Sequence, residues 1–383
     1  MENKFLSHKY KDNKENLMSG VANLKNKFKD IIDLSLGDPD IITDESIIRA
    51  AFEDTKRGYT RYSNPTGDIE LIDAITDFYK KNRNISFNQN EIMAVVGACH
   101  GIYLALQAIL NDGEEVIVHS PYFTPYKQQI DMAKGKFVEL ETLEQDGFTI
   151  NLKKLEALIN TRTKAIILNS PNNPTGAFFP KELLEEIAKI AIKNDLVVIS
   201  DEVYDDFTYE DEFCSIASLP GMKERTITLG SFSKDFCMTG WRIGYVAAPD
   251  YIINTMKNIN EGICFSAPTI SQRAAIHALK NRNKIVSKIT KEFKKRMEYA
   301  YSRIKTIPKL SAIKPKAGIY IFLNIKETGK SSLEFCNELL NTAHIIAIPG
   351  NAFGKYGEGY VRIACTVNIS ALEEAFDRIE KIL

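Results

Sequence analysis

The residue whose surroundings most clearly suggest chemistry is Lys234. It follows two serines in the run Ser231-Phe232-Ser233-Lys234, and Arg242 comes eight positions later. A lysine acts as a nucleophile when its amine is neutral part of the time and is held against an electrophile. The neighbouring hydroxyls and the arginine indicate that this electrophile carries a phosphate, which arginine binds through two parallel hydrogen bonds. The run therefore predicts pyridoxal phosphate, a phosphorylated aldehyde, bound to Lys234 as a Schiff base.

A lysine after serines is usually an ordinary surface residue, so other parts of the chain must supply the rest of a site. One such part is Ser200-Asp201-Glu202-Val203-Tyr204, where an apolar run ends in an acid. A buried carboxylate needs a cationic partner, and a protonated ring nitrogen is one, although Asp201 could instead cap a helix. Tyr204 is close enough in sequence to reach the 3-oxygen of the same ring.

Three further segments suit a flat phosphorylated ring. Small residues at Gly97-Ala98-Cys99 open a helix and leave N–H groups free for an anion. Phe123 can stack on the ring, and Asn173, in a turn fixed by prolines, can donate to a phenolate oxygen. Taken singly, these segments are equally well explained as turns and core packing. Each of them follows an apolar run, however, and open parallel sheets bind ligands beyond the carboxyl ends of their strands.

The elements that position these groups are indicated by the apolar runs themselves. Short β-rich runs occur at 92–96, 115–118, 165–168, 196–199, 226–229 and 243–247. Continuously apolar strands suit a sheet that is covered on both faces. Helical periodicity lies between them, as at 180–194, which opens with proline. This alternation of strands and helices predicts a mostly parallel α/β sheet.

The pattern changes from about residue 278. A long basic helix is followed by short strands near 319–324 and 359–365 and by a last helix at 370–382. These elements predict a second, smaller α+β domain, onto which we expect the N-terminal stretch to pack. The predicted boundaries are 46–277 for the large domain, and 1–45 with 278–383 for the small domain and its N-terminal arm.

Composition and charge exclude several classes of protein. The chain has 383 residues, of which 44% are hydrophobic and 26% charged, as is typical of a globular protein with a large core. A net charge of -1 provides no bulk attraction to nucleic acid or to a membrane surface. No run approaches the roughly 18 to 20 apolar residues of a membrane span, and the polar N-terminus is unlike a signal peptide. The six cysteines form no C-x-x-C pair, so we expect free thiols, no metal site and a cytoplasmic location.

Nearly the whole chain resembles the fold-type I pyridoxal-phosphate-dependent aminotransferases of class I/II, in the aspartate aminotransferase-like superfamily. The motifs that carry the resemblance are LGDPD at 36–40, YSNPTG at 62–67, GACHG at 97–101, SPYF at 120–123, NNPTG at 172–176, DEVY at 201–204, SFSK to GWRIG at 231–244, PGNAFG at 349–354 and YVRIA at 360–364. The resemblance implies a seven-stranded, mostly parallel sheet between helices, with a smaller α+β domain. It also implies transfer of an amino group from an L-amino acid to a 2-oxo acid, with 2-oxoglutarate as the expected acceptor, by a ping-pong mechanism.

The same resemblance implies roles for residues around the cofactor ring. Lys234 forms the Schiff base and, once released from it, moves a proton between the substrate Cα and the cofactor. Asp201 pairs with the ring nitrogen, while Tyr204 and Asn173 contact the 3-oxygen. Phe123 stacks on the ring, where some relatives carry tryptophan.

The remaining implied roles concern phosphate, substrate and a second subunit. Phosphate is bound by Ser231, Ser233, Arg242 and the amides of Ala98 and Cys99. Arg362 holds the substrate α-carboxylate, with Gly37 and Asn173 nearby. Tyr62 reaches the phosphate of the neighbouring subunit's cofactor, which implies a homodimer with shared sites.

Two alternatives keep the resemblance but change the activity. A β-lyase that cleaves cysteine conjugates, or a decarboxylase, uses the same electron sink, although the segment DFCMTGWRIG after Lys234 is more similar to transaminases. A non-catalytic ligand sensor of transcription regulators carries an N-terminal DNA-binding domain, for which we expect no room before residue 31.

The substrate side chain is left open by the sequence. A dicarboxylate needs a second cation besides Arg362, and Arg61, Lys127 and Arg273 are candidates, each also explained as a surface or packing residue. The pocket wall is expected to include Tyr126, Phe265 and Tyr320, with residues around 17–20. His100 stands where many relatives have an acid or glutamine, and its role is also open.

Overall fold

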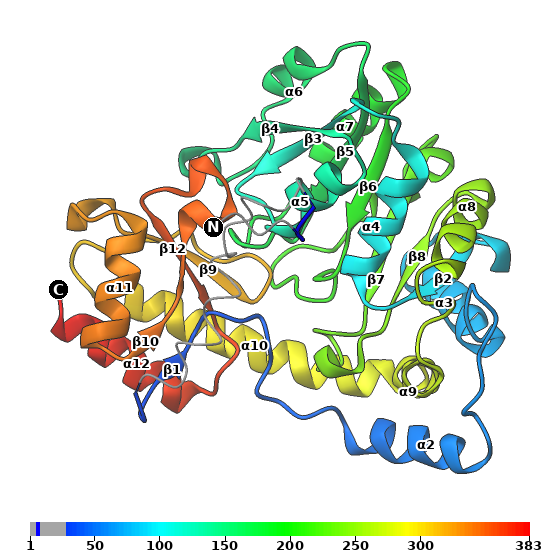
Figure 1. Ribbon diagram of the computed structural model, residues 1–383. Helices are drawn as coiled ribbons and strands as arrows, with labels where there is room; N and C mark the ends of the chain where they lie inside the picture. Colours follow the sequence, from blue (N-terminus) through cyan, green and yellow to red (C-terminus); the bar gives the residue numbers. More distant parts are fainter. Residues whose placement is uncertain (1–4, 8–27) are drawn as a thin grey trace.

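The computed structural model describes residues 5–7 and 28–383. Its centre is a seven-stranded sheet in the order β2-β8-β7-β6-β5-β3-β4 (Figure 1). The strands are β2 (Ile92–Val95), β3 (Glu115–Ser120), β4 (Lys136–Glu141), β5 (Thr163–Asn169), β6 (Val197–Asp201), β7 (Thr226–Ser231) and β8 (Gly244–Ala247). Strand β8 runs antiparallel to both of its neighbours, and the other pairings are parallel.

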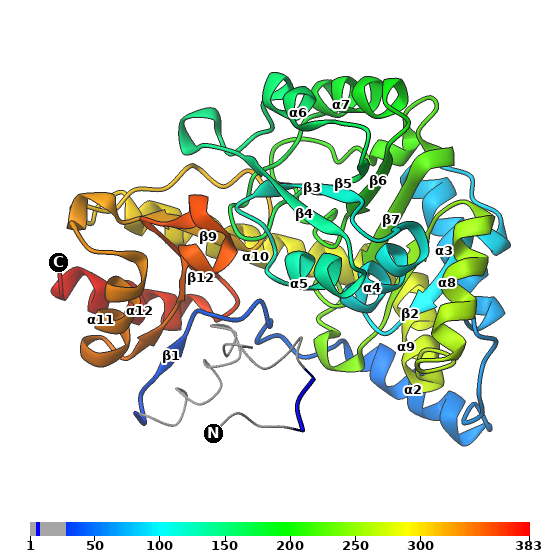
Figure 2. The ribbon, with the colours of Figure 1, turned by 45° about the horizontal axis from the view of Figure 1, so that its top comes forward.

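Helices cover both faces of this sheet, and this explains why its central strands contain continuous apolar runs. Along β2, Met93 and Val95 join one buried cluster, whereas Ile92 and Ala94 join another on the opposite face. One face is covered by α4 (Ala98–Ile109), α5 (Pro125–Met132) and α8 (Asp250–Glu261). The other is covered by α3 (Ile69–Asn82), α6 (Leu152–Leu158), α7 (Lys181–Lys193) and α9 (Thr269–Lys280), with α2 (Glu45–Lys56) packed on α9. Figure 2 shows α6 and α7 on one side of the strands and α4 and α5 on the other.

A second, three-stranded antiparallel sheet lies beside the first. Its order is β11-β12-β9, and the strands are β9 (Tyr320–Asn324), β11 (Ile348–Pro349) and β12 (Tyr360–Ala364). It shares a core with α10 (Arg282–Ile304), α11 (Ser332–Thr342) and α12 (Ile369–Lys381). The short strand β1 (Ile32–Asp33) pairs in parallel with β10 (Ile345–Ile346), so this part of the N-terminal segment lies against the C-terminal elements (Figure 1).

The predicted fold class is confirmed, and each of the six predicted strands of the large sheet is present within a few residues. The sequence analysis located no strand at β4, whose residues KFVELE are mostly half-buried at the edge of the sheet and form no continuous apolar run. In the part of the chain that the structure describes, no helix is long and apolar enough to cross a membrane.

The direction of each strand decides which residues lie at a given edge of the large sheet. The carboxyl ends of β2, β3, β5, β6 and β7 share one edge of the sheet, because these strands are parallel to one another. The antiparallel β8 begins at that edge instead of ending there. Arg242, two residues before the start of β8, is therefore carried to the same place as residues that follow the parallel strands.

Candidate active site

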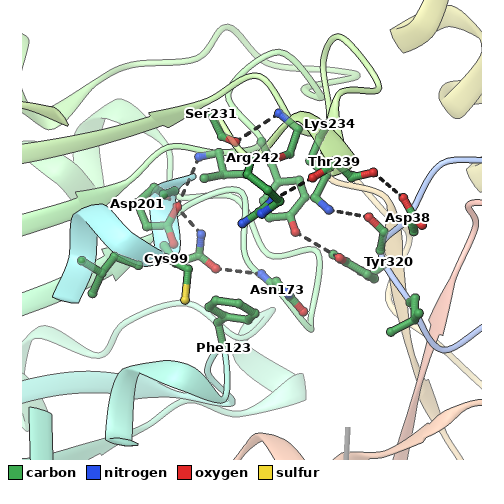
Figure 3. A pocket seen from close by; sticks show the side chains of 18 of the residues that line it. Asp38, Cys99, Phe123, Asn173, Asp201, Ser231, Lys234, Thr239, Arg242 and Tyr320 are labelled. Carbon is green, nitrogen blue, oxygen red and sulfur yellow. Dashed lines mark hydrogen bonds between the residues drawn. The ribbon is translucent and has the colours of Figure 1, made fainter. Parts of the chain in front are cut away.

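A pocket of about 290 Å³ opens at this edge, between the two sheets. Asp201 and Ser231 end strands of the large sheet, whereas Tyr320 and Arg362 come from strands of the small one. Figure 3 shows Asp201, Ser231 and Tyr320 converging with Asn173, Lys234 and Arg242. The remaining described residues of the lining are Leu36, Gly37, Asp38, Ala98, Cys99, Ile102, Phe123, Asn169, Val203, Tyr204, Ser233 and Thr239.

Lys234 is half-buried in the loop after β7, with its amine directed into the pocket. The Nζ atom donates a hydrogen bond to the carbonyl oxygen of Gly37. The preceding turn is held by Ser231, whose Oγ accepts a 3.1 Å hydrogen bond from the Ser233 amide. These contacts place in the pocket an amine whose hydrogen-bond partner, among the described residues, is a carbonyl oxygen and not a carboxylate.

Asp201 is 5% exposed at the end of β6. Burial raises the pKa of its carboxyl to about 6, although hydrogen bonds from the Tyr126 hydroxyl and the Val203 amide oppose this shift. Its main-chain oxygen accepts a 3.1 Å hydrogen bond from the Asn169 side chain, which fixes the end of the strand. A cation placed next to this carboxylate would offset the cost of burying its charge.

The amino end of α4 forms a cradle suited to an anion. Gly97 precedes the helix with φ 75°, and no side chain caps the open N–H groups. A Cβ atom at Gly97 would lie 2.6 Å from Nη2 of Arg242, so only glycine allows the guanidinium to approach this turn. Helix N–H groups, the hydroxyls of Ser231 and Ser233 and an arginine together form a site that fits a phosphate.

Arg362 is the most deeply buried cation of the pocket, with 1% exposure. Its Nη1 donates a 3.0 Å hydrogen bond to Oδ1 of Asn173, and Nη2 donates to the carbonyl oxygen of Ser35. Nε has no hydrogen-bond partner among the described residues, and burial lowers the pKa of the guanidinium. A buried guanidinium that lacks a carboxylate partner is suited to receiving one from a ligand.

Comparisons with known proteins agree with this geometry. The sequence model of the family described as aminotransferase class I and II matches residues 29–379. The chain belongs to this family. It is 45% identical to an aspartate aminotransferase of Pyrococcus abyssi, over 93% of this chain and 92% of that protein. It is 41% identical to an aromatic-amino-acid aminotransferase 2 of Thermococcus litoralis, over 92% of each. The crystal structure of an aromatic aminotransferase from Pyrococcus horikoshii superimposes with a TM-score of 0.91 and 41% identity, over 95% of this chain and 98% of that one.

The protein is thus a pyridoxal-phosphate-dependent aminotransferase. The residues present fit this cofactor, because the pocket combines an amine, a phosphate cradle and a buried carboxylate whose raised pKa calls for a cation. Membership of the family favours transamination over the lyase and sensor alternatives. The amino-acid and oxo-acid chemistry of the aminotransferase follows from the same relatives.

The aminotransferase brings together twelve of the thirteen predicted site residues in one pocket, and their individual roles stay predictions. Tyr62 is the exception: it is 84% exposed and is not among the described residues that line the pocket. Its ring packs edge-on against Phe265, with centroids 5.2 Å apart. Neither aromatic therefore faces the cofactor site of its own subunit.

Other candidates from the sequence have different surroundings. Arg273 is buried in ion pairs with Asp54 and Asp68, which makes it a packing residue. The Nδ1 atom of His100 accepts a 3.2 Å hydrogen bond from the Val96 amide, and burial lowers the pKa of its ring. Residues 17–20 lie outside the described part of the chain.

Two contributors to the site were not recognised in advance. Asn169 ends β5 and accepts a 2.9 Å hydrogen bond from the Asn173 amide, so it shapes the turn that carries Asn173. Its place at a strand end was a usable signal. Tyr126 was expected only as a pocket wall, but its hydroxyl donates to Asp201. No pattern in the sequence links these two residues, which are 75 positions apart.

Proposed function

We propose that this enzyme transfers the amino group of an L-amino acid to 2-oxoglutarate, using Lys234 as its covalent and proton-carrying residue. The observation that carries the proposal is the convergence of Lys234, Asp201 and Arg362 in one pocket. When bound, pyridoxal phosphate supplies a sink for the electrons released at the substrate Cα. Lys234 Nζ would hold the cofactor at rest, and its amine would remove the proton from the substrate Cα during turnover.

The other pocket residues hold and polarise these groups. Asp201 keeps a proton on the ring nitrogen, a role supported by its burial and by the absence of another cation beside it among the described residues. Tyr204 and Asn173 donate to the 3-oxygen. Arg242, the serine hydroxyls and the α4 amides bind the phosphate, while Phe123 stacks on the ring. These contacts orient the cofactor so that proton transfer occurs at one carbon.

The substrate side chain is proposed to be aromatic. Three cations line the pocket in the described part of the chain. Each has a role in the proposal: Lys234 binds the cofactor aldehyde, Arg242 the phosphate and Arg362 the α-carboxylate. No described lining residue supplies a fourth cation for a side-chain carboxylate. The guanidinium of Arg362 lies instead between aromatic rings, 4.6 Å from the centre of Tyr320 and 4.8 Å from that of Phe353. The apolar Leu36 lines the same pocket.

A half-reaction screen tests this function. The purified enzyme is mixed with single amino acids in the absence of any oxo acid, and the absorbance band of the bound cofactor is followed. We expect aromatic amino acids to convert the band faster than aspartate or alanine, with one equivalent of 2-oxo acid formed and the band restored by 2-oxoglutarate. Release of pyruvate and ammonia from a β-substituted amino acid, without any need for an oxo acid, would instead establish a lyase. Faster conversion by aspartate would overturn only the proposed side-chain preference.

The enzyme is further proposed to work as a homodimer in which Tyr62 completes the partner's phosphate site. Support comes from the exposure of Tyr62 and from the exposed aromatic residues near it, Tyr59 and Phe265. Because Tyr62 does not line the pocket of its own subunit, the phosphate proposed to contact it belongs to the partner.

Hybrid dimers provide the sharpest test of this shared site. Lys234→Ala and Tyr62→Ala subunits are each expected to be impaired, but a mixture of the two should regain activity. In a hybrid, one site keeps both Lys234 and the Tyr62 of the other subunit, whereas the second site carries both lesions. Random reassociation makes about half of the dimers hybrids with one intact site of two, so roughly a quarter of the wild-type activity is expected. No gain on mixing, despite hybrids detected by mass spectrometry, would show that Tyr62 does not act across subunits.

We also propose domain boundaries and a cellular location for the enzyme. The large domain is proposed to span 46–277 and the small domain 278–383 with the segment before 46, supported by the pairing of β1 with β10. A cytoplasmic location is proposed because the described chain keeps its cysteines as free thiols, some of them buried.

A further inference from the structure

Tyr320 occupies an unusual position between the two sheets. It belongs to β9 of the small sheet and is 2% exposed, yet its hydroxyl lies 3.0 Å from the hydroxyl of Tyr204, beyond the end of β6. Its ring packs edge-on against that of Tyr204, with centroids 5.7 Å apart. The only hydroxyl that contacts Tyr204 in the described structure therefore comes from the opposite wall of the pocket.

The same tyrosine touches two other parts of the site. The guanidinium carbon of Arg362 lies 4.6 Å from the centre of its ring. A Cβ atom on Gly37 would lie 1.8 Å from its hydroxyl oxygen, so this oxygen fills the space beside Gly37, whose carbonyl accepts from Lys234. Tyr320 is therefore in contact with the groups proposed to hold the α-carboxylate, the cofactor 3-oxygen and the resting lysine.

We propose that Tyr320 is a positioning residue whose hydroxyl donates a hydrogen bond to the hydroxyl of Tyr204. This bond strengthens the hydrogen bond that Tyr204 donates to the 3-oxygen of the cofactor. This inference rests on the role proposed for Tyr204. The hydroxyl of Tyr204 has a single proton, and an anionic 3-oxygen can only accept. With that oxygen bound, Tyr204 donates to it, and the contact at 3.0 Å then requires Tyr320 to donate to Tyr204.

The direction of the effect follows from this order of donors. A hydroxyl that accepts a hydrogen bond becomes a stronger donor in turn, and the effect is larger in a buried site. Stronger donation by Tyr204 stabilises negative charge on the 3-oxygen. That charge is greatest when the nitrogen joining Lys234 to the cofactor has lost its proton, so the relay lowers the pH at which this nitrogen titrates.

The test is a pH titration of the absorbance band of the resting enzyme, without substrate. Tyr320→Phe keeps the ring, and hence its contact with Arg362, but removes the hydroxyl that reaches Tyr204 and lies beside Gly37. We expect the titration midpoint to rise by roughly 0.3 to 1 pH unit, with a smaller change in kcat than the one caused by Tyr204→Phe. The matched control is Tyr360→Phe, on the neighbouring strand β12. It removes a hydroxyl that is hydrogen-bonded to Glu144 and Lys326 and lies outside the pocket lining. It should leave the midpoint unchanged.

A double variant separates failure of this inference from failure of the site assignment. If Tyr320 acts through Tyr204, Tyr320→Phe should shift the midpoint in the wild type but not in a Tyr204→Phe background. An unchanged midpoint in Tyr204→Phe alone would reject the role of Tyr204. A clear shift in Tyr204→Phe with none in Tyr320→Phe, or equal shifts by Tyr320→Phe in both backgrounds, would reject the relay and leave the site assignment intact.

Discussion

Replacing Lys234 with alanine is expected to abolish transamination and the absorbance band of the covalently bound cofactor. The variant loses the only amine that lines the pocket in the described structure, and with it both the bond to the cofactor and the base that removes the Cα proton. General base catalysis alone contributes about 10²- to 10⁴-fold, so we expect the loss in kcat to be at least about 10⁴-fold when the covalent role is lost as well. The measurements are single-turnover kinetics and an absorbance spectrum.

The control for this variant is Lys257→Ala, on the outer helix α8. Lys257 contacts Glu261 at 4.0 Å and is not among the residues that line the active-site pocket. It should retain both activity and spectrum. A Lys234→Ala enzyme that keeps the band, or that turns over at a rate similar to the control, would contradict the assignment.

Asp201→Asn is expected to reduce kcat/KM by about 10²- to 10⁴-fold, because removing one partner of a buried ion pair costs about 3–5 kcal/mol. Asparagine keeps the shape of the side chain and can still accept from the Tyr126 hydroxyl, but it carries no charge. The ring nitrogen then loses its proton, and the electron sink weakens. The measurements are steady-state kinetics, together with the affinity of the cofactor-free protein for pyridoxal phosphate.

Glu202→Gln is the matched control, since Glu202 is the next residue and is equally buried. Its carboxylate accepts from the hydroxyls of Ser200 and Ser215, away from the pocket lining. Burial raises the pKa of this carboxyl to about 8, and glutamine keeps its shape and one oxygen to accept from both hydroxyls. Near wild-type activity in Glu202→Gln, with a large loss in Asp201→Asn, would assign the effect to the charge at Asp201. Equal losses in both would assign it to packing.

Much of the fold could be predicted because the strands of the large sheet are buried on both faces. Runs such as 165–168 are apolar at every position, which makes them visible without any structure. The rule that ligands bind beyond strand ends then grouped Asp201 and Lys234 correctly in one pocket. Strand β4 escaped notice for the opposite reason, because its edge position leaves its residues only partly buried.

Contacts between the two sheets could not be predicted in the same way. The contact of Tyr320 with Tyr204, and the hydrogen bond from Arg362 to Asn173, join residues more than 100 positions apart. They depend on how β9 and β12 are set against the large sheet, and no local pattern encodes that arrangement. The family resemblance suggested Arg362 as a carboxylate ligand, but only the structure reveals that its Nε is buried without a hydrogen-bond partner among the described residues.

The most direct test of the central claim is to locate the covalent bond to the cofactor. The resting enzyme is treated with borohydride, which reduces and traps the bond between pyridoxal phosphate and a lysine, and is then digested and mapped by mass spectrometry. The predicted result is a single phosphopyridoxyl group on the peptide that contains Lys234, at one per subunit. Labelling of a different lysine, or the absence of any labelled peptide from enzyme that is active, would contradict the account.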